Sequence, residues 1–300
     1  MLLLLVVIIT ILLGGAFLPG RTLFSNDGPL GRLMSQCHRL PDAFHGVWED
    51  LNSVGYREQG ALPNITDGLL LLLHPILLSK FYAAIAILIL GLSAWCFFRQ
   101  LGLGPAACIL GGLAAALNSD FFSEACWGVA SHPITVGLAF FAMAALVKTS
   151  TWRSWLYALL AGAAVGMGLA EGADVGAIFS IYVAAFAIYQ AWIAEGPRVK
   201  NLALSAGKLA VVAGFAALVS AQAIFVLVNT QIEGVTGMSQ DEQTRESRWQ
   251  WATRWSLPKR EALGIVVPGI FGYRLDTTNG GYYWGALGRS PAWEKYLANG

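Results

Sequence analysis

The chain has 300 residues, of which 56% are hydrophobic and 12% are charged, and its mean hydropathy is +0.58. A soluble domain spends about a quarter of its residues on charge, so the composition excludes an ordinary globular protein. Its net charge of +1, without a basic run, argues against nucleic acid as a partner. Charged residues concentrate in two segments, 20–66 and 230–300. The sequence therefore predicts an all-α polytopic membrane protein with a transmembrane domain over 1–229 and a polar segment over 230–300.

The apolar runs predict about seven transmembrane helices, because roughly 20 apolar residues cross the hydrocarbon layer. The first run lacks a basic n-region and a cleavage site, which indicates an uncleaved span rather than a signal peptide. The second run is too long for one crossing, and His74-Pro75 with Lys80 predicts a short interfacial helix before a span from about Phe81. Gly111-Gly112 in the third run suits close helix packing. The runs are 1–18, 69–98, 103–117, 133–147, 155–170, 175–194 and 209–228.

The distribution of Lys and Arg in the short connections predicts the orientation. The connections 99–104, 148–154 and 194–208 hold six of these residues, whereas 119–132 and 170–174 hold none. The large first loop, 20–66, and the tail from residue 230 then lie outside the cytoplasm. Cys37 and Cys126 fall on this outer side, where a disulfide is chemically allowed, although nothing in the sequence shows that they meet. Asn64-Ile65-Thr66 is a glycosylation sequon on the same side.

Two acidic groups in the first loop are candidates for catalysis. Asp27 follows the first span closely, where a carboxylate can act as general base on an acceptor hydroxyl or bind a divalent cation. The alternative is a turn at Asn26-Asp27-Gly28. Glu49 and Asp50 are adjacent carboxylates that could help to gather Mg²⁺ or Mn²⁺, with an exposed helical turn as the alternative. The metal hypothesis rests on Asp27 and Asp50.

Further polar residues on the outer side are candidates for substrate binding. Glu171 and Asp174 interrupt apolar sequence at a membrane edge. An ionisable residue there is a candidate functional residue, because its burial is costly. They would share a face if the turn between them is helical, and a tight acidic hairpin is the alternative. His132 begins the next span on the same side. If these loops converge, they line one outward cavity.

The tail alternates tryptophan with cationic residues, beginning at Arg248 and Trp249. This pattern favours a segment that lies in the plane of the outer leaflet. The more specific alternative is that these residues stack on a sugar or bind a phosphate. Tyr283 and Trp284 belong to a glycine-framed aromatic cluster that could stack on a sugar or pack into a core. No Walker A loop or HExxH motif supports ATP-driven transport or zinc proteolysis.

Three groups of short patches resemble the bacterial YfhO-like membrane proteins of the GT-C class of glycosyltransferases. They are residues 25–29, residues 121–128, and residues 268–272 with 283–285 in the tail. The resemblance implies sugar transfer from a polyprenyl-phosphate donor to a glycan, lipid or protein acceptor at the outer face of a bacterial inner or plasma membrane. It also implies an essential Asp in the first outer loop. Asp27 matches that position best, with Glu49 and Asp50 as the second candidate.

The length departs from this family, whose members are usually longer and have more spans. The chain stops at Gly300 within a polar outer segment, which indicates a fragment or a split gene product. Two further hypotheses therefore stand beside the transferase. One is a non-enzymatic transporter or assembly subunit for envelope glycans or lipids, which would bind substrate in the same cavity. The other is an inactive fragment of a longer enzyme.

Overall fold

The computed structural model describes residues 1–23, 25–45, 47–49, 56–58, 62–147 and 152–228, together with short pieces between 246 and 295. The chain forms two compact units, Met1–Val235 and Thr236–Gly300, and each is described by itself. The described part of the first unit is helical, apart from the antiparallel pair β1 (Val47–Glu49) and β2 (Tyr56–Glu58). In the second unit, the short helices η3 (Lys259–Ala262) and α12 (Leu263–Val266) follow each other directly.

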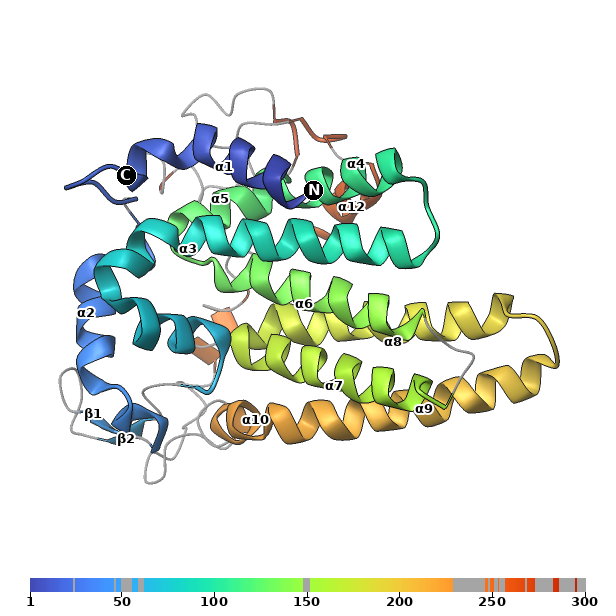
Figure 1. Cartoon of the computed structure of the whole chain (residues 1–300). Coiled ribbons are helices and arrows are strands. Elements are labelled where there is room, and N and C mark those ends of the chain that lie inside the picture. Colours follow the sequence, from blue (N-terminus) through green and yellow to red (C-terminus); the bar gives the residue numbers. More distant parts are fainter. Residues whose placement is uncertain are drawn as a thin grey trace. The chain divides into compact units, whose positions relative to one another are not determined.

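The helices of the first unit cover the apolar runs of the sequence and also include a helix in the first loop (Figure 1). In chain order they are α1 (Leu2–Phe17), α2 (Leu30–Arg39), η1 (Asp42–His45), α3 (Ile65–Gln100), α4 (Pro105–Ala116), α5 (Ser119–Trp127), α6 (Ser131–Leu146), α7 (Ser154–Glu171), α8 (Ala173–Ile193), α9 (Arg198–Val219) and α10 (Ala221–Leu227).

Several of these helices are long and apolar enough to cross a membrane. Within the described residues α3, α7, α8 and α9 qualify, and α4 with α5 makes a fifth span if this pair, bent by 45°, counts as one. The helices α1 and α6 are apolar but shorter. The chain is thus a polytopic helical membrane protein, and the count of seven spans stays a prediction.

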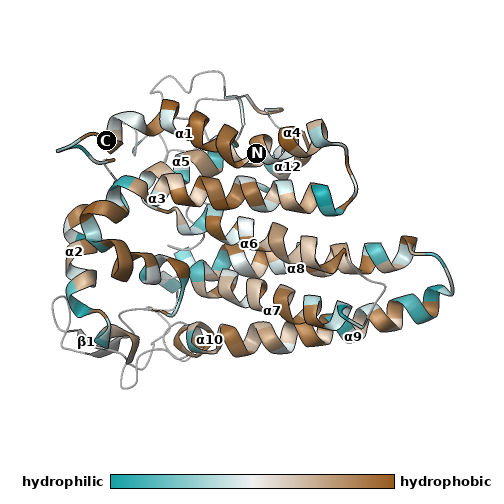
Figure 2. Cartoon of the chain, viewed as in Figure 1, coloured by the Kyte–Doolittle hydropathy of each residue, from teal (hydrophilic) through white to brown (hydrophobic). Residues whose placement is uncertain are grey.

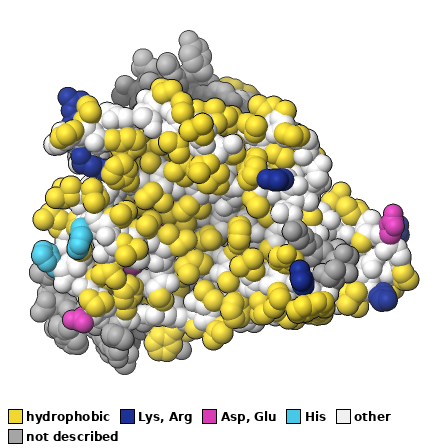
Figure 3. Space-filling view, viewed as in Figure 1, with side chains coloured by type: hydrophobic (Ala, Val, Ile, Leu, Met, Phe, Trp, Pro, Cys, Tyr) yellow, Lys and Arg dark blue, Asp and Glu magenta, His cyan; other side chains and the backbone are white. Residues whose placement is uncertain are grey.

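The long helices of the first unit lie side by side (Figure 1). α3 packs against α1, α4 and α6, while α7 packs against α6 and α9. Buried side chains form one core cluster around Leu5, Ile87 and Ile134 and a second around Ala161 and Val183. Apolar residues run along the helices and polar ones gather toward the helix ends (Figure 2), and apolar side chains cover most of the face shown in Figure 3. This surface suits a bilayer, which has no water to solvate charge.

The predicted break at His74-Pro75 is present inside α3. His74 has φ 59° and ψ 163°, so the helix is interrupted there and the chain changes direction (Figure 1). Proline has no N–H to donate and disfavours a helical conformation of the residue before it. The helix resumes at Pro75 and runs to Gln100, so it begins before Phe81, and the start of the membrane span near Phe81 stays a prediction.

Three other sequence predictions are resolved by the helices. The Gly111-Gly112 pair does allow close packing, since a Cβ on Gly112 would lie 2.8 Å from the carbonyl oxygen of Gly91 on α3. The connection expected over 194–208 is largely helical, because α9 already begins at Arg198. All four cysteines are free thiols, so Cys37 and Cys126 form no disulfide.

Candidate functional site

Asp27 lies in a short turn that is fastened to the end of α5. The backbone N–H of Asp27 donates to the carbonyl oxygen of Trp127 at 3.0 Å, and Ser25 Oγ donates to the same carbonyl at 2.9 Å. The N–H of Gly28 closes the turn by donating to Ser25 Oγ at 2.9 Å. The turn proposed as the structural alternative is therefore present, and it leaves the Asp27 carboxylate exposed.

Gly128 makes this docking possible. It ends α5 in the left-handed conformation, with φ 97°, which a residue with a side chain adopts only at a cost. A Cβ at Gly128 would lie 2.6 Å from the backbone nitrogen of Gly28 and would collide with Ser25 Oγ. Only glycine lets the two backbones approach this closely, so Gly128 helps to fix the position of Asp27.

Glu171, the last residue of α7, caps the beginning of α3. Its side chain is only 8% exposed, and Oε2 accepts the backbone N–H groups of Ile65 at 2.9 Å and Thr66 at 3.2 Å. The Thr66 hydroxyl donates to Oε1. The first N–H groups of a helix have no partner within the helix, and a carboxylate there also interacts favourably with the helix dipole. The buried acid is thus matched by three donors.

The sequon residues also belong to this junction. Asn64 Oδ1 accepts the backbone N–H of Asp67 at 2.7 Å as the N-cap of α3, while Nδ2 donates to the carbonyl oxygen of Ala170 at 3.2 Å. The Thr66 hydroxyl also bonds to the hydroxyl of Tyr82, which lies beyond the break at His74 in α3. The Asn64 oxygen therefore caps α3, while its amide nitrogen holds the beginning of α3 against α7.

These elements surround one cavity of about 530 Å³, which we call the polar cavity. Asp27 and Glu171 both line it, so the structure brings these two predicted residues together. Asp67 adds a third carboxylate, and Arg32 of α2 adds a guanidinium whose Nη1 donates to the backbone oxygen of Asp27 at 3.2 Å. The other polar lining residues are Gln36, Asn64, Thr66, Tyr82 and Ser131.

Two other predicted site residues lie outside this lining. The His132 ring nitrogen Nδ1 lies 3.2 Å from a carboxylate oxygen of Glu124, where the two side chains form a pair. The carboxylate of Asp174 is exposed and accepts the N–H of Val175 at 2.8 Å. The turn between Glu171 and Asp174 is not helical, because Gly172 is extended (φ −153°, ψ 98°) and separates α7 from α8, so the condition for a shared face is not met.

The remaining predicted residues are not brought to this cavity by any described contact. Nothing is described of the Glu49 side chain, and Asp50 and Arg248 lie outside the described residues. Trp249 and Trp284 belong to the second unit and are exposed. The ring of Trp284 lies 5.3 Å from that of Phe271, while the Tyr283 hydroxyl donates to the carboxylate of Glu261.

No three His, Cys, Asp or Glu side chains of the described residues come together as a metal site. The Mg²⁺ or Mn²⁺ hypothesis on Asp27 and Asp50 stays a prediction, because Asp50 lies outside that part of the chain.

A second cavity, of about 620 Å³, lies on another face of α2, and we call it the apolar cavity. Its α2 lining comes from Met34, Cys37 and His38, whereas Arg32 and Gln36 of the same helix line the polar cavity. The α3 side of the apolar cavity is lined by Leu73, His74, Pro75, Ile76 and Leu77 around the helix break. α2 therefore contributes to two cavities of opposite character.

Arg32 and Gln36 were not predicted as cavity residues, because α2 was not predicted. Tyr82 was not predicted either, because it lies within an apolar run and reaches the cavity from α3. The signal for α2 was present, since Leu30, Leu33, Met34 and Cys37 recur at the spacing of an amphipathic helix.

The chain matches no protein-family model, and no curated protein and no solved structure is detectably similar to it. The fold and the site together define a helical membrane protein with a charged cavity at one end of its bundle and an apolar cavity beside it.

Proposed function

We propose that the protein is a membrane glycosyltransferase that moves a sugar from a polyprenyl-phosphate carrier to an acceptor outside the cytoplasm. The observation that carries this proposal is the position of α2, which lines a charged cavity with one set of side chains and an apolar cavity with another. A lipid-linked sugar has the same two parts, a charged head and an apolar chain. The distribution of Lys and Arg in the short connections favours the outer side for both cavities.

Asp27 is the acid in the polar cavity best suited to act as a base. Glu171 is committed to the backbone of α3, and the Asp67 carboxylate accepts the N–H of Leu62 at 3.0 Å. The Asp27 carboxylate is exposed to the cavity and accepts a bond from the neighbouring Asn26 amide at 3.1 Å. An exposed carboxylate can approach an acceptor hydroxyl, which is the first requirement for general base catalysis.

The reaction needs one displacement at the anomeric carbon. The acceptor oxygen forms a bond to this carbon while the bond to the carrier phosphate breaks, and the acceptor proton passes to Asp27. The bonding electrons leave with the phosphate, whose added charge would be stabilised by Arg32. A guanidinium suits this role, because its planar N–H groups bind phosphate oxygens in pairs. The product has the inverted anomeric configuration, and no covalent enzyme intermediate is formed.

The test is transfer of radiolabel from a panel of polyprenyl-phosphate sugars by the purified full chain in lipid nanodiscs, with membrane glycans and lipids as acceptors. We expect Asp27→Asn to reduce kcat by at least about a hundredfold, the scale of a lost general base. Arg32→Gln should also reduce transfer. Asp120→Asn, an exposed acid in the first turn of α5, should behave as wild type. Full activity of Asp27→Asn would contradict the assignment.

The same assay separates the transferase from a transporter or assembly subunit. If the wild-type chain binds the labelled carriers in the nanodiscs but releases no sugar to any acceptor, the cavity binds substrate without chemistry. Flipping of a fluorescent carrier lipid by reconstituted vesicles would then support the transporter.

A further inference from the structure

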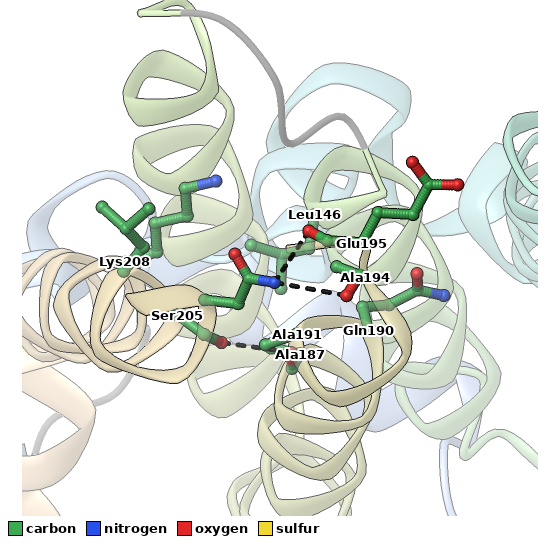
Figure 4. A pocket seen from close by; sticks show the side chains of 10 residues that line it. Leu146, Ala187, Gln190, Ala191, Ala194, Glu195, Ser205 and Lys208 are labelled. Atoms are coloured by element: carbon green, nitrogen blue, oxygen red, sulfur yellow. Dashed lines mark hydrogen bonds between the residues drawn. The ribbon is translucent and has the colours of Figure 1, made fainter. Parts of the chain in front are cut away.

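A third cavity lies at the C-terminal end of α8, the end opposite to the junction of Glu171 with α3. Figure 4 shows this cavity, of about 300 Å³, between α8 and α9, and we call it the hairpin cavity. α8 begins beside Glu171 and runs for 21 residues to Ile193, so a full helix length separates the two ends. Nothing in the proposed transferase reaction uses the hairpin cavity.

The walls of the hairpin cavity are held by hydrogen bonds between the two helices. The Asn201 amide donates to the carbonyl oxygens of Ala194 and Glu195 at 3.3 and 3.1 Å, and Ser205 Oγ donates to that of Ala187 at 3.1 Å (Figure 4). The two Asn201 bonds satisfy carbonyl groups just beyond the end of α8 that have no partner within the helix. The cavity is therefore shaped by the fold, with an apolar base of alanine and leucine side chains from Leu146, Ala187, Ala191 and Leu204.

The hairpin cavity lies at the edge of the apolar layer. Leu146, the last residue of α6, lines it together with Lys208, the residue just before the apolar run that begins at Leu209. The α8–α9 hairpin continues beyond the ends of α6 and α7 (Figure 1). On the same hairpin, the Arg198 guanidinium lies 5.0 Å from the ring centre of Trp192, and tryptophan prefers the membrane–water interface. This is the depth at which lipid headgroups lie.

Opposite charges stand on opposite sides of this cavity. In Figure 4 the Lys208 ammonium points to one side and the Glu195 carboxylate to the other. The Gln190 side chain adds an amide on the Glu195 side. A ligand that places a negative group near Lys208 and a positive group near Glu195 would match both charges, whereas a purely anionic ligand would meet an unfavourable carboxylate.

We propose that the hairpin cavity binds the headgroup of a phospholipid with a primary ammonium, of the phosphatidylethanolamine type. The phosphate lies near Lys208, and the ammonium donates hydrogen bonds to Glu195 and Gln190. A choline headgroup has no N–H to donate, so it fits less well. A glycerol headgroup has no positive charge for Glu195.

The test uses the purified full chain in detergent, to which phosphatidylethanolamine, phosphatidylglycerol or phosphatidylcholine with identical acyl chains is added. Native mass spectrometry measures the lipid retained. We expect phosphatidylethanolamine to bind at least about tenfold more tightly than the other two, which corresponds to one well-placed ionic contact. Lys208→Met should reduce binding of phosphatidylethanolamine about tenfold, whereas Lys208→Arg should retain it. Glu195→Lys should shift the preference to phosphatidylglycerol.

Lys200→Met is the matched control, because Lys200 is an exposed cation of the same helix outside the cavity lining. Equal retention of the three lipids by the wild-type chain, or an equal loss in Lys200→Met and Lys208→Met, would overturn the proposal. Glu195→Lys changes an exposed residue between helices, so it tests the preference even if Lys208→Met fails to fold. Asp27→Asn should bind lipid as the wild type does, which keeps this result separate from that of the transfer assay.

Discussion

The carboxylate of Glu171, at the end of α7, accepts the backbone N–H of Ile65 at a distance of 2.9 Å, at the beginning of α3. One side chain thereby joins two candidate membrane spans at the rim of the polar cavity. The same carboxylate accepts the N–H and the hydroxyl of Thr66. The position of the first turn of α3, which supplies Asp67 to the cavity, therefore depends on Glu171.

Replacing Glu171 by alanine should destabilise the protein. The change leaves the N–H groups of Ile65 and Thr66 without their partner, and unpaired buried donors with a lost helix cap cost about 2 kcal/mol or more. Thermal unfolding in detergent measures the effect. Asp120→Ala, which removes an exposed acid from the first turn of α5, should cost less than about 1 kcal/mol. Equal unfolding temperatures for the two variants would contradict the capping role.

Gly128→Ala should displace the turn that carries Asp27. The new Cβ would lie 2.6 Å from the nitrogen of Gly28, and the left-handed conformation adds a strain of about 1 kcal/mol for a residue with a side chain. We expect lower sugar transfer together with a lower unfolding temperature. Gly31→Ala, on α2, has open space around its new methyl group and should leave both quantities unchanged or slightly raised.

Gly166→Val should separate α7 from α9. A Cβ at Gly166 would lie 2.6 Å from the carbonyl oxygen of Ala216, so the larger side chain forces the helices apart at a cost of about 1–3 kcal/mol. Gly214→Ala, on α9, has no atom within 4 Å of the new Cβ and should stabilise the helix by about 0.5–1 kcal/mol. Thermal unfolding of the two variants should therefore shift in opposite directions.

The predicted orientation can be tested with single cysteines in a variant whose four native cysteines are replaced by alanine. Asp120→Cys should react with a membrane-impermeant maleimide added to intact cells, because α5 lies in a connection without Lys or Arg. Lys200→Cys should react only after the membrane is permeabilised. The reverse pattern would place the polar cavity in the cytoplasm and would contradict the proposed outer-face reaction.

The sequence predicted the apolar helices well but their ends less well. Hydropathy identifies where lipid surrounds a helix, and it does not show that the helix continues into water. α9 is the clearest example, because it begins at Arg198, ten residues before the polar residue Lys208 that precedes the apolar run. The break at His74-Pro75 was predictable because the effect of proline on the backbone is local.

The candidate site was predictable only in part, since Asp27 and Glu171 were named from the sequence but Arg32, Gln36 and Tyr82 were not. Asp27 and Glu171 could be identified because an ionisable side chain at a membrane edge is costly to bury, so such a residue is a candidate for function. The partner of Glu171 could not be read from the sequence, because the N–H of Ile65 lies 106 positions earlier in the chain. The spacing of Glu171 and Asp174 suggested a shared face, but the extended Gly172 removes the helical geometry on which that spacing depends.

The contact between Glu171 and Ile65 also has a consequence for the order of assembly during synthesis. The first turn of α3 leaves the ribosome long before Glu171, the residue that caps it. The N–H groups of this turn therefore lack their carboxylate partner until α7 has been made. The polar cavity therefore cannot take its final form before α7 has been inserted. A chain interrupted before residue 171 would carry Asp27, Arg32 and Asp67 but would lack the closure that holds the beginning of α3 in place.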